Sequence, residues 1–361
     1  MRLLRLKAGF FRNVSATDIS LHPQFNCIYG HNGSGKSTLL EMIYCLGRGR
    51  SFRTHLTQPI VQYRAEACHV FAELASNTIT TTIGFEKSIR SKLRLKMGVN
   101  QQAPTLIELA DLLPIQLIHP NCHDLLNHGP KRRRQFLNWG MFHVEPQFLP
   151  LWQQLSHALK QRNAALQQSQ AVSCVTAWDY EIVRVGLLLS ELRQRYFELL
   201  KGMVSHFLAQ LLDFYSLEMA YYPGWDAKQD LSTCFKQNLA GDISRRYTRM
   251  GPHRFDLILK IHDLPVELVL SRGEQKRLIC ALYLAQGKLI QKLSGKHCIY
   301  LLDDVMHELD THYQRQLWET LEQLECQVFI TAISSSSFDR FHTLQNNQQF
   351  HIDQGNIVPV S

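Results

Sequence analysis

Gly30-His31-Asn32-Gly33-Ser34-Gly35-Lys36-Ser37 is the stretch of this 361-residue sequence that decides its fold. It matches the phosphate-binding pattern Gly-x-x-x-x-Gly-Lys-Ser/Thr at every required position. Residues 25–29 before it predict a short buried strand, and residues 37–44 predict a helix. The glycines allow backbone N–H groups to surround an anion, and the helix N-terminus adds partial positive charge. Strand, loop and helix in this order predict a nucleotide site rather than a turn that only caps a helix.

The side chains of this loop have separate expected roles. Lys36 should reach the β- and γ-phosphates of ATP, and the Ser37 hydroxyl should ligate Mg²⁺. The other residues of the predicted cofactor site are Gly30, His31, Asn32, Gly33, Ser34, Gly35 and Thr38. ATP and Mg²⁺ are therefore the predicted cofactors.

A second segment, Ile299-Tyr300-Leu301-Leu302-Asp303-Asp304, is an apolar strand that ends in two carboxylates. Two acids after a strand can be a solvated turn, but a phosphate loop in the same chain favours the Walker B interpretation. Asp303 is then expected to hold Mg²⁺ with Ser37, and Asp304 to position and polarise the attacking water. The predicted catalytic residues are Asp304, Asp303 and Lys36.

A third segment, Leu270-Ser271-Arg272-Gly273-Glu274, precedes an apolar helix and resembles the Leu-Ser-x-Gly-Gln/Glu signature of ABC ATPases. The resemblance implies that Ser271 and Gly273 contact the γ-phosphate of ATP held by a second subunit. By itself the segment could be an ordinary helix N-cap. His307-Glu308-Leu309-Asp310 resembles the D-loop that follows Walker B. The order of these motifs predicts an α/β fold, a P-loop ABC/SMC-type ATPase head.

The rest of the chain predicts a strand-rich N-terminal part and an inserted helical lobe. Apolar residues recur three and four apart at Val185, Leu188, Leu192, Tyr196, Leu199, Met203, Phe207 and Leu211. The expected domains are a discontinuous ATPase head, residues 1–125 and 215–361, and a helical lobe, residues 126–214. These apolar seams are too short for long heptad arms, which disfavours a structural SMC-type tether.

Composition narrows the function classes. The formal charge of +8 is compatible with a polyanionic partner but also with a solvated cationic surface. The nine cysteines are scattered and never form Cys-x-x-Cys, which argues against a zinc site or a disulfide framework and favours a reducing compartment. No apolar run is long enough to span a bilayer. A cytoplasmic protein without membrane association is expected.

Five further segments resemble the RecF family, and the likeness runs from end to end: Phe11-Arg12-Asn13, residues 49–53, residues 132–140, residues 161–166 and Gly251-Pro252-His253-Arg254-Phe255-Asp256-Leu257. The resemblance implies an ATP-dependent homodimer that binds double-stranded DNA or gapped junctions and hydrolyses ATP slowly. It also implies help in recombinase loading with RecO and RecR, and a nucleotide contact by Arg12. Glu274, His307 and Phe255 depart from the family pattern, which puts hydrolysis rate and subunit communication in doubt.

Two basic segments are candidate DNA contacts. Lys92, Arg94 and Lys96 alternate with leucines, so a strand would place the three cations on one face. Arg132 and Arg133 form the second candidate. A merely solvated surface explains either segment equally well.

Two questions stay open at this stage. Gln116 and Asn121 are both candidates for the Q-loop residue. The alternative function is the nucleotide-binding subunit of an ABC transporter. The helical insertion and Thr331-Ala332-Ile333-Ser334, where transporters carry a switch histidine, speak against it.

Overall fold

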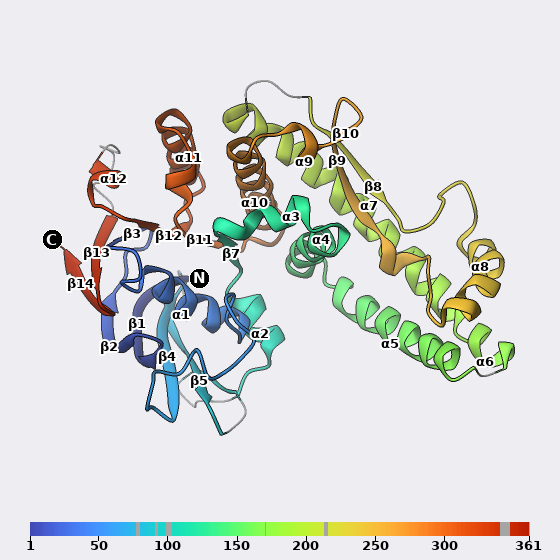
Figure 1. The fold of residues 1–361 in the computed structure, drawn as a ribbon, viewed down its shortest axis with the longest axis horizontal. Coiled ribbons are helices and arrows are strands. Elements are labelled where there is room, and N and C mark those ends of the chain that lie inside the picture. Colours follow the sequence, from blue (N-terminus) through green and yellow to red (C-terminus); the bar gives the residue numbers. More distant parts are fainter. Residues whose placement is uncertain are drawn as a thin grey trace. The chain divides into compact units, whose positions relative to one another are not determined.

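The computed structural model describes residues 1–76, 80–90, 93–98, 103–169, 171–212, 216–339 and 347–360. Contacts divide the chain into two compact units, residues 1–122 with 290–361, and residues 123–289. Figure 1 shows the elements of each unit. Residues 216–289 thus share a compact unit with the helices, whereas the sequence analysis assigns them to the ATPase head. The head boundaries proposed from sequence stay a prediction.

A six-stranded sheet carries the phosphate loop in the first unit. Its order is β14 (Asn356–Val360), β13 (Asn347–Asp353), β3 (Phe25–Tyr29), β12 (Gln327–Ala332), β11 (Ile299–Leu302) and β7 (Ile115–Ile118). All neighbours from β13 to β7 are parallel, and only β14 is antiparallel. β11 and β12 are buried at every position, as apolar strands of covered parallel sheets are. The carboxyl ends of β3, β12, β11 and β7 therefore lie at one edge.

A five-stranded antiparallel sheet forms the other layer of this unit. Its order is β2 (Val14–Ser20), β1 (Arg2–Phe11), β4 (Ala67–Ala75), β5 (Thr80–Ser88) and β6 (Arg94–Met97). Helix α1 (Lys36–Arg48) shares one apolar core with both sheets. Leu39 and Ile43 of α1 belong to the same cluster as Phe85 of β5 and Phe329 of β12. Enclosure by both sheets fixes α1, and with it the loop at its N-terminus.

Shorter elements complete the first unit. They are α2 (Leu106–Leu112), most of the 3-10 helix η1 (Pro120–His123), the 3-10 helix η3 (Val305–Glu308), α11 (Thr311–Gln323) and α12 (Ser336–Asp339). Thr105 caps α2 in a reciprocal capping box with Glu108, and α2 packs on α1.

The second unit is mainly helical, and its bounds include residues 126–214, for which the sequence predicts a helical lobe. Its helices are α3 (Asp124–Asn127), α4 (Pro130–Val144), α5 (Phe148–Gln167), α6 (Val172–Thr176), α7 (Asp179–Leu211), α8 (Leu231–Arg245), η2 (Pro252–Arg254), α9 (Val266–Val269) and most of α10 (Arg272–Ser294). A small antiparallel sheet has the order β10 (Leu264–Pro265), β9 (Asp256–Ile261), β8 (Glu218–Tyr222). In the part of the chain that is described, no helix is both long and apolar enough to cross a membrane.

The buried face of α7 differs in part from the predicted seam. Val185, Leu192 and Phe207 are buried, but Leu188 and Leu199 are 42% and 50% exposed. Ile182, Leu189, Leu200 and Val204 are buried instead. Leucines occur on several faces of this helix, so the spacing of apolar residues alone did not show which face is buried.

A buried arginine organises the polar interior of this unit. Arg162 of α5 is fully buried and pairs with Asp179 at 2.7 Å and Asp242 at 2.8 Å. It also donates to Thr248, which Asn163 binds in turn. The family-like segment 161–166 therefore serves to join α5, α7 and α8.

Candidate nucleotide-binding site

The phosphate loop follows β3 at the carboxyl edge of the six-stranded sheet and leads directly into α1. Gly30 has φ +154°, and a Cβ there would lie 2.2 Å from the Ile352 carbonyl oxygen. Gly33 has φ +81°, and a Cβ there would meet nothing within 4 Å. No side chain caps α1, and no acidic residue lies in its first turn. The loop thus combines backbone that only glycine adopts easily with a helix N-terminus suited to an anion.

Lys36 closes over the loop from the first turn of α1. Its side chain is 4% exposed, and Nζ donates to the carbonyl oxygens of Gly30 at 2.7 Å and His31 at 3.1 Å. An ammonium group has three donors, so it can exchange these carbonyls for phosphate oxygens without leaving the loop. The observed position of the Lys36 ammonium group is therefore suited to the phosphate contact that the sequence predicts.

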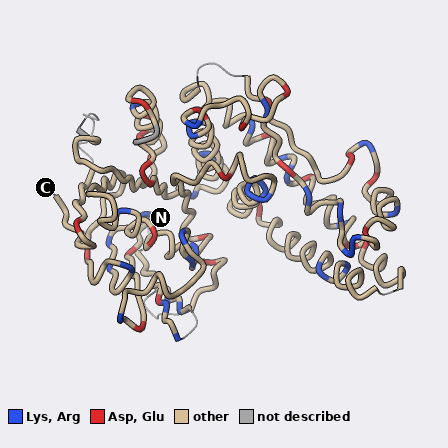
Figure 2. Tube along the Cα trace, viewed as in Figure 1, with Lys and Arg blue, Asp and Glu red and all other residues tan. Residues whose placement is uncertain are grey.

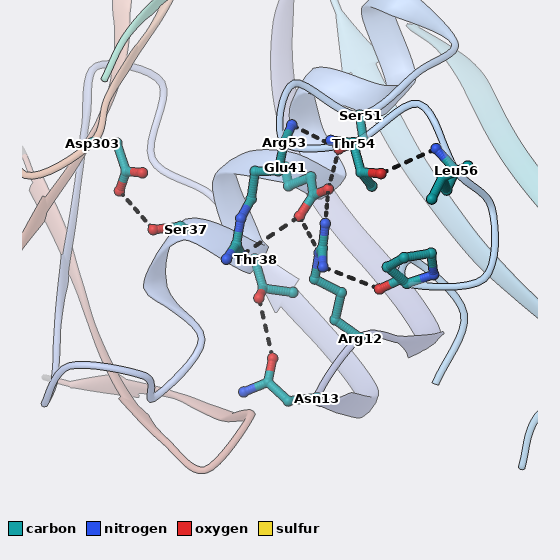
Figure 3. A network of polar contacts seen from close by, with 11 residues as sticks. Arg12, Asn13, Ser37, Thr38, Glu41, Ser51, Arg53, Thr54, Leu56 and Asp303 are labelled. Carbon is teal, nitrogen blue, oxygen red and sulfur yellow. Dashed lines mark hydrogen bonds and ion pairs between the residues drawn. The ribbon is translucent and has the colours of Figure 1, made fainter. Parts of the chain in front are cut away.

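Ser37 and Asp303 come together although 266 positions separate them. The Ser37 hydroxyl donates to Asp303 Oδ1 at 3.0 Å, as Figure 3 shows. β12 lies between β3 and β11, so both parallel strands end beside it at the same edge. The two predicted Mg²⁺ ligands are thus adjacent, and both offer oxygen, the donor atom that Mg²⁺ prefers.

Asp303 is in an environment that penalises its negative charge. Burial raises the pKa of its carboxyl above the usual value, and the charge of Asp304 adds to this, while hydrogen bonds from Ser37 and Thr331 oppose it. Among the described residues, no group of three or more His, Cys, Asp or Glu side chains could hold a metal by itself. One carboxylate and one hydroxyl suit Mg²⁺, which keeps several waters and binds substrate phosphates in such sites.

Thr331, at the end of β12, links the two acids and was missed as a site residue from sequence. Its hydroxyl lies 3.1 Å from Asp303 Oδ1 and 3.3 Å from Asp304 Oδ1. The same hydroxyl oxygen accepts the Asp304 N–H at 2.8 Å. Asp304 has φ +49°, an uncommon conformation for a non-glycine residue, and this hydrogen bond holds it there. We infer that Thr331 positions Asp304.

Thr331→Val should lower ATP turnover about tenfold while changing ATP affinity little, because it removes the acceptor of a part-buried N–H at a nearly constant side-chain shape. Steady-state hydrolysis and equilibrium ATP titration measure the two effects. Thr320→Val is the matched control, since Thr320 is also a buried threonine, 4% exposed against 0% for Thr331, but its hydroxyl donates within α11. Equal turnover in both variants would contradict the positioning role.

Arg12 belongs to a polar network around Glu41, a buried residue of α1. Figure 3 shows its guanidinium bound to both carboxylate oxygens of Glu41, and it also donates to the Pro59 carbonyl at 3.0 Å. Ser51 donates to the same carboxylate, and its oxygen accepts the Arg53 N–H. This network anchors the segment after α1. Direct contact of Arg12 with a nucleotide stays a prediction.

Asn13 is a second residue that sequence reasoning missed. Its Nδ2 donates to the Ser34 carbonyl at 2.9 Å, and its Oδ1 accepts from the Thr38 hydroxyl at 3.1 Å. One amide thus holds the loop to the start of α1. The only sequence signal was its place beside Arg12 in a family-like segment.

The remaining loop side chains divide by exposure. His31 and Asn32 are exposed, whereas Ser34 is 6% exposed. The Ser34 hydroxyl is buried, and it has no hydrogen-bond partner among the described residues. A nucleotide contact at these three positions stays a prediction.

The signature-like segment belongs to the second compact unit and begins α10. The Ser271 N–H donates to the Glu274 carboxylate at 2.8 Å, and Ser271 Oγ accepts the Glu274 N–H at 3.4 Å. This is the reciprocal arrangement of a capping box, so Glu274 has a local structural role at the position where it departs from the family pattern. Ser271 is exposed and Gly273 is part-exposed. The N-cap interpretation is confirmed, and contact with a second subunit's γ-phosphate stays a prediction.

The two Q-loop candidates have different positions. Gln116 is 2% exposed in the middle of β7, opposite Tyr300 of β11. Asn121 is exposed in η1, just beyond the carboxyl end of β7. Ligands of parallel α/β sheets bind outside that edge. The geometry therefore favours Asn121.

Comparisons with known proteins find RecF relatives over the whole length of this chain. Residues 2–353 match the RecF/RecN/SMC N terminal domain family. The DNA replication and repair protein RecF of Shewanella denitrificans is 37% identical over 100% of both chains. That of Pseudomonas putida (strain W619) is 39% identical over 99% of this chain and 98% of its own. This chain belongs to the RecF family.

Solved structures confirm the predicted ATPase-head class. A structure of the recombination mediator protein RecF with ATP, of the RecFOR pathway, matches with a TM-score of 0.86 at 25% identity and covers 100% of this chain and 98% of its own. An Smc head bound to the C-winged helix domain of ScpA matches in fold, with a TM-score of 0.63 at 14% identity, and covers 100% of this chain and 98% of its own. End-to-end membership of the RecF family leaves the transporter alternative without support.

The first basic segment shows the predicted alternation over residues 93–96. Arg94 and Lys96 on edge strand β6 are exposed, while Leu93 and Leu95 pack against the core. Lys92 lies outside the described residues. Arg94 is 3.8 Å from Glu86, and elsewhere on this sheet cations and carboxylates are interleaved (Figure 2). DNA contact by Arg94 and Lys96 stays a prediction.

The second basic segment contains two different kinds of arginine. Arg132 is half-exposed and lies 3.5 Å from Asp124. The guanidinium of Arg133 is mostly buried and makes a bidentate pair with Asp256, at 2.9 Å and 2.7 Å. Phosphate contact by Arg133 would require this pair to break, so the structure gives it a role in holding α4 to β9. The sequence alone did not show which of these two adjacent arginines is exposed and which is paired with a carboxylate.

Proposed function

We propose that this protein is an ATP-dependent DNA-binding protein of recombinational repair and replication-fork maintenance. The observation that carries the proposal is the Ser37–Asp303 contact, which joins the phosphate loop to Walker B in a RecF-family chain. The 25%-identical RecF whose structure contains ATP supports ATP as the nucleotide. The nine cysteines, all free, are compatible with the cytoplasmic location we propose.

In the proposed mechanism the loop backbone and Lys36 bind the phosphates of ATP. Ser37 and Asp303 would hold Mg²⁺, which supplies positive charge that offsets the charge of the phosphates and the buried carboxylate. Asp304, oriented through Thr331, would then position water for hydrolysis. Because hydrolysis would serve as a switch, slow turnover is sufficient.

The DNA partner is proposed to be a duplex or a gapped junction, bound by an ATP-induced homodimer. Assistance to recombinase loading with RecO and RecR is part of the proposal and rests on family membership and on the RecFOR description of the solved relative. The test is DNA binding by purified protein with and without ATP at several salt concentrations. ATP-independent binding, or none at all, would contradict the proposal.

DNA affinity should fall steeply with salt, because each phosphate contact releases counterions. Replacing Arg94 and Lys96 together with Gln should reduce the salt slope by about two if both contact phosphates. Equilibrium fluorescence anisotropy from low to moderate salt measures the slope. Lys228→Gln/Lys236→Gln, at exposed positions in the second unit, makes the same change in net charge as a control. An unchanged slope in the Arg94/Lys96 variant would show that these residues are part of a solvated surface and do not contact DNA phosphates.

A further inference from the structure

A pocket of about 210 Å³ lies inside the second compact unit, between α4, α5, α7 and the η2 turn. One face of α4 contributes Lys131, Arg134 and Asn138, while Arg193 comes from α7 and His253 from η2. Helix α5 supplies a largely apolar wall that includes Trp152. Figure 2 shows basic residues along α4. None of the described residues that line the pocket is acidic, although three carry a permanent positive charge.

Arg193 is the feature of this pocket that most needs a counter-charge. It is 2% exposed, and its charge forms no ion pair with a carboxylate among the described residues. Nη1 donates to the Pro252 carbonyl at 2.8 Å, and the guanidinium lies 3.8 Å from the centre of the Phe255 ring. Its Nε is buried without a hydrogen-bond partner in the described part of the chain. The Tyr221 side chain also hydrogen-bonds Arg193, but burial still disfavours a charge that no carboxylate neutralises, so a bound anion would stabilise this arrangement.

Two other groups in the wall are hydrogen-bond acceptors. His253 Nε2 lies 3.1 Å from the Thr248 carbonyl, which can only accept, so the ring proton is on Nε2 and Nδ1 has a free lone pair. Burial lowers the pKa of His253 to about 4, so the ring is neutral near pH 7. Asn138 Oδ1 is buried, and within the described residues it has no partner. Such a pocket suits a ligand that carries both anionic oxygens and a hydroxyl.

We propose that this pocket binds the phosphate group of inorganic phosphate or of a small phosphate monoester. Arg134 and Lys131 at the entrance and Arg193 inside would supply positive charge to the anionic oxygens, and the acceptors would receive a ligand hydroxyl. The volume lies below the roughly 300–1,000 Å³ of pockets for drug-sized ligands, which fits a small oxyanion. The site lies among residues of the second unit alone and is separate from the phosphate loop.

The site is tested in the full-length Lys36→Ala variant, so that the phosphate loop does not dominate the titration. Inorganic phosphate and glycerol monophosphate, a small monoester, are titrated separately by calorimetry. We expect saturable binding of at least one. Tighter binding of inorganic phosphate would identify the free ion as the ligand, and tighter binding of the monophosphate would identify an ester.

Lys131→Gln and Arg134→Gln should each weaken this binding about tenfold, because each removes a charge-assisted contact. Arg132→Gln is the matched control, since Arg132 is on the same helix but does not line the pocket. Melting temperatures check folding, and Lys131→Gln tests the site even if Arg134→Gln unfolds, because Lys131 is exposed. No saturable binding of either probe, or equal weakening by Arg132→Gln, would overturn the proposal.

Discussion

Lys36→Ala should abolish ATP binding, with affinity reduced by at least about a hundredfold, because the β- and γ-phosphates lose their positioned ammonium group. In the structure this ammonium is held by the Gly30 and His31 carbonyls, so it is already at the loop before a ligand arrives. Equilibrium titration of ATP, with Mg²⁺ present, measures the loss. Undiminished affinity would show that the phosphate-loop assignment is wrong.

The control for this variant must separate lost charge from a collapsed loop. Lys36→Ala also removes the donor to two loop carbonyls, which could change the loop itself. Lys36→Arg keeps a cation at this position, and Lys7→Ala removes a partly exposed lysine of β1 that pairs with Asp18. We expect the three variants to melt at similar temperatures without ATP. Only the variants with a cation at position 36 should melt at a higher temperature when ATP is added.

The parts of the site that could be predicted from sequence are those in which a few consecutive residues determine the role of a side chain. Strand, glycine loop and helix place Lys36 and Ser37, and an apolar strand ending in acids places Asp303. Each assignment needs only a few consecutive residues. The comparisons show the RecF family and the predicted fold class, while the roles of these segments stay a prediction.

The residues that were missed depend on which strands are neighbours. Thr331 contacts both acids because β12 lies between β3 and β11, and Asn13 reaches Ser34 across the loop from the turn between β1 and β2. Nothing in the local sequence gives that order. The role of Arg133 could not be predicted for the same reason, because its partner Asp256 is 123 residues away in the sequence.

Ser271→Arg should leave ATP binding near the parental level but prevent ATP-dependent dimerisation and hydrolysis. As the ABC resemblance implies, the signature of one subunit faces the γ-phosphate held by the other. A two-fold pair would then place ATP between Lys36 and Ser37 of one chain and Ser271 and Gly273 of its partner, twice. Ser271 is exposed at the N-terminus of the 23-residue helix α10, where an anion is favoured. A bulky cation there would fill the space that the γ-phosphate needs.

The dimerisation experiment compares ATP with ADP, because the γ-phosphate supplies the interaction that differs between monomer and dimer. Sedimentation of the parent should show monomers alone and with ADP, and dimers with ATP under conditions of slow hydrolysis. Ser271→Ala is the matched variant: it loses the hydroxyl of the capping box with Glu274 but leaves the space open. It should dimerise better than Ser271→Arg, so that steric exclusion is separated from loss of the cap. A parent that stays monomeric at saturating ATP, or a Ser271→Arg variant that dimerises equally well, would contradict the two-fold sandwich.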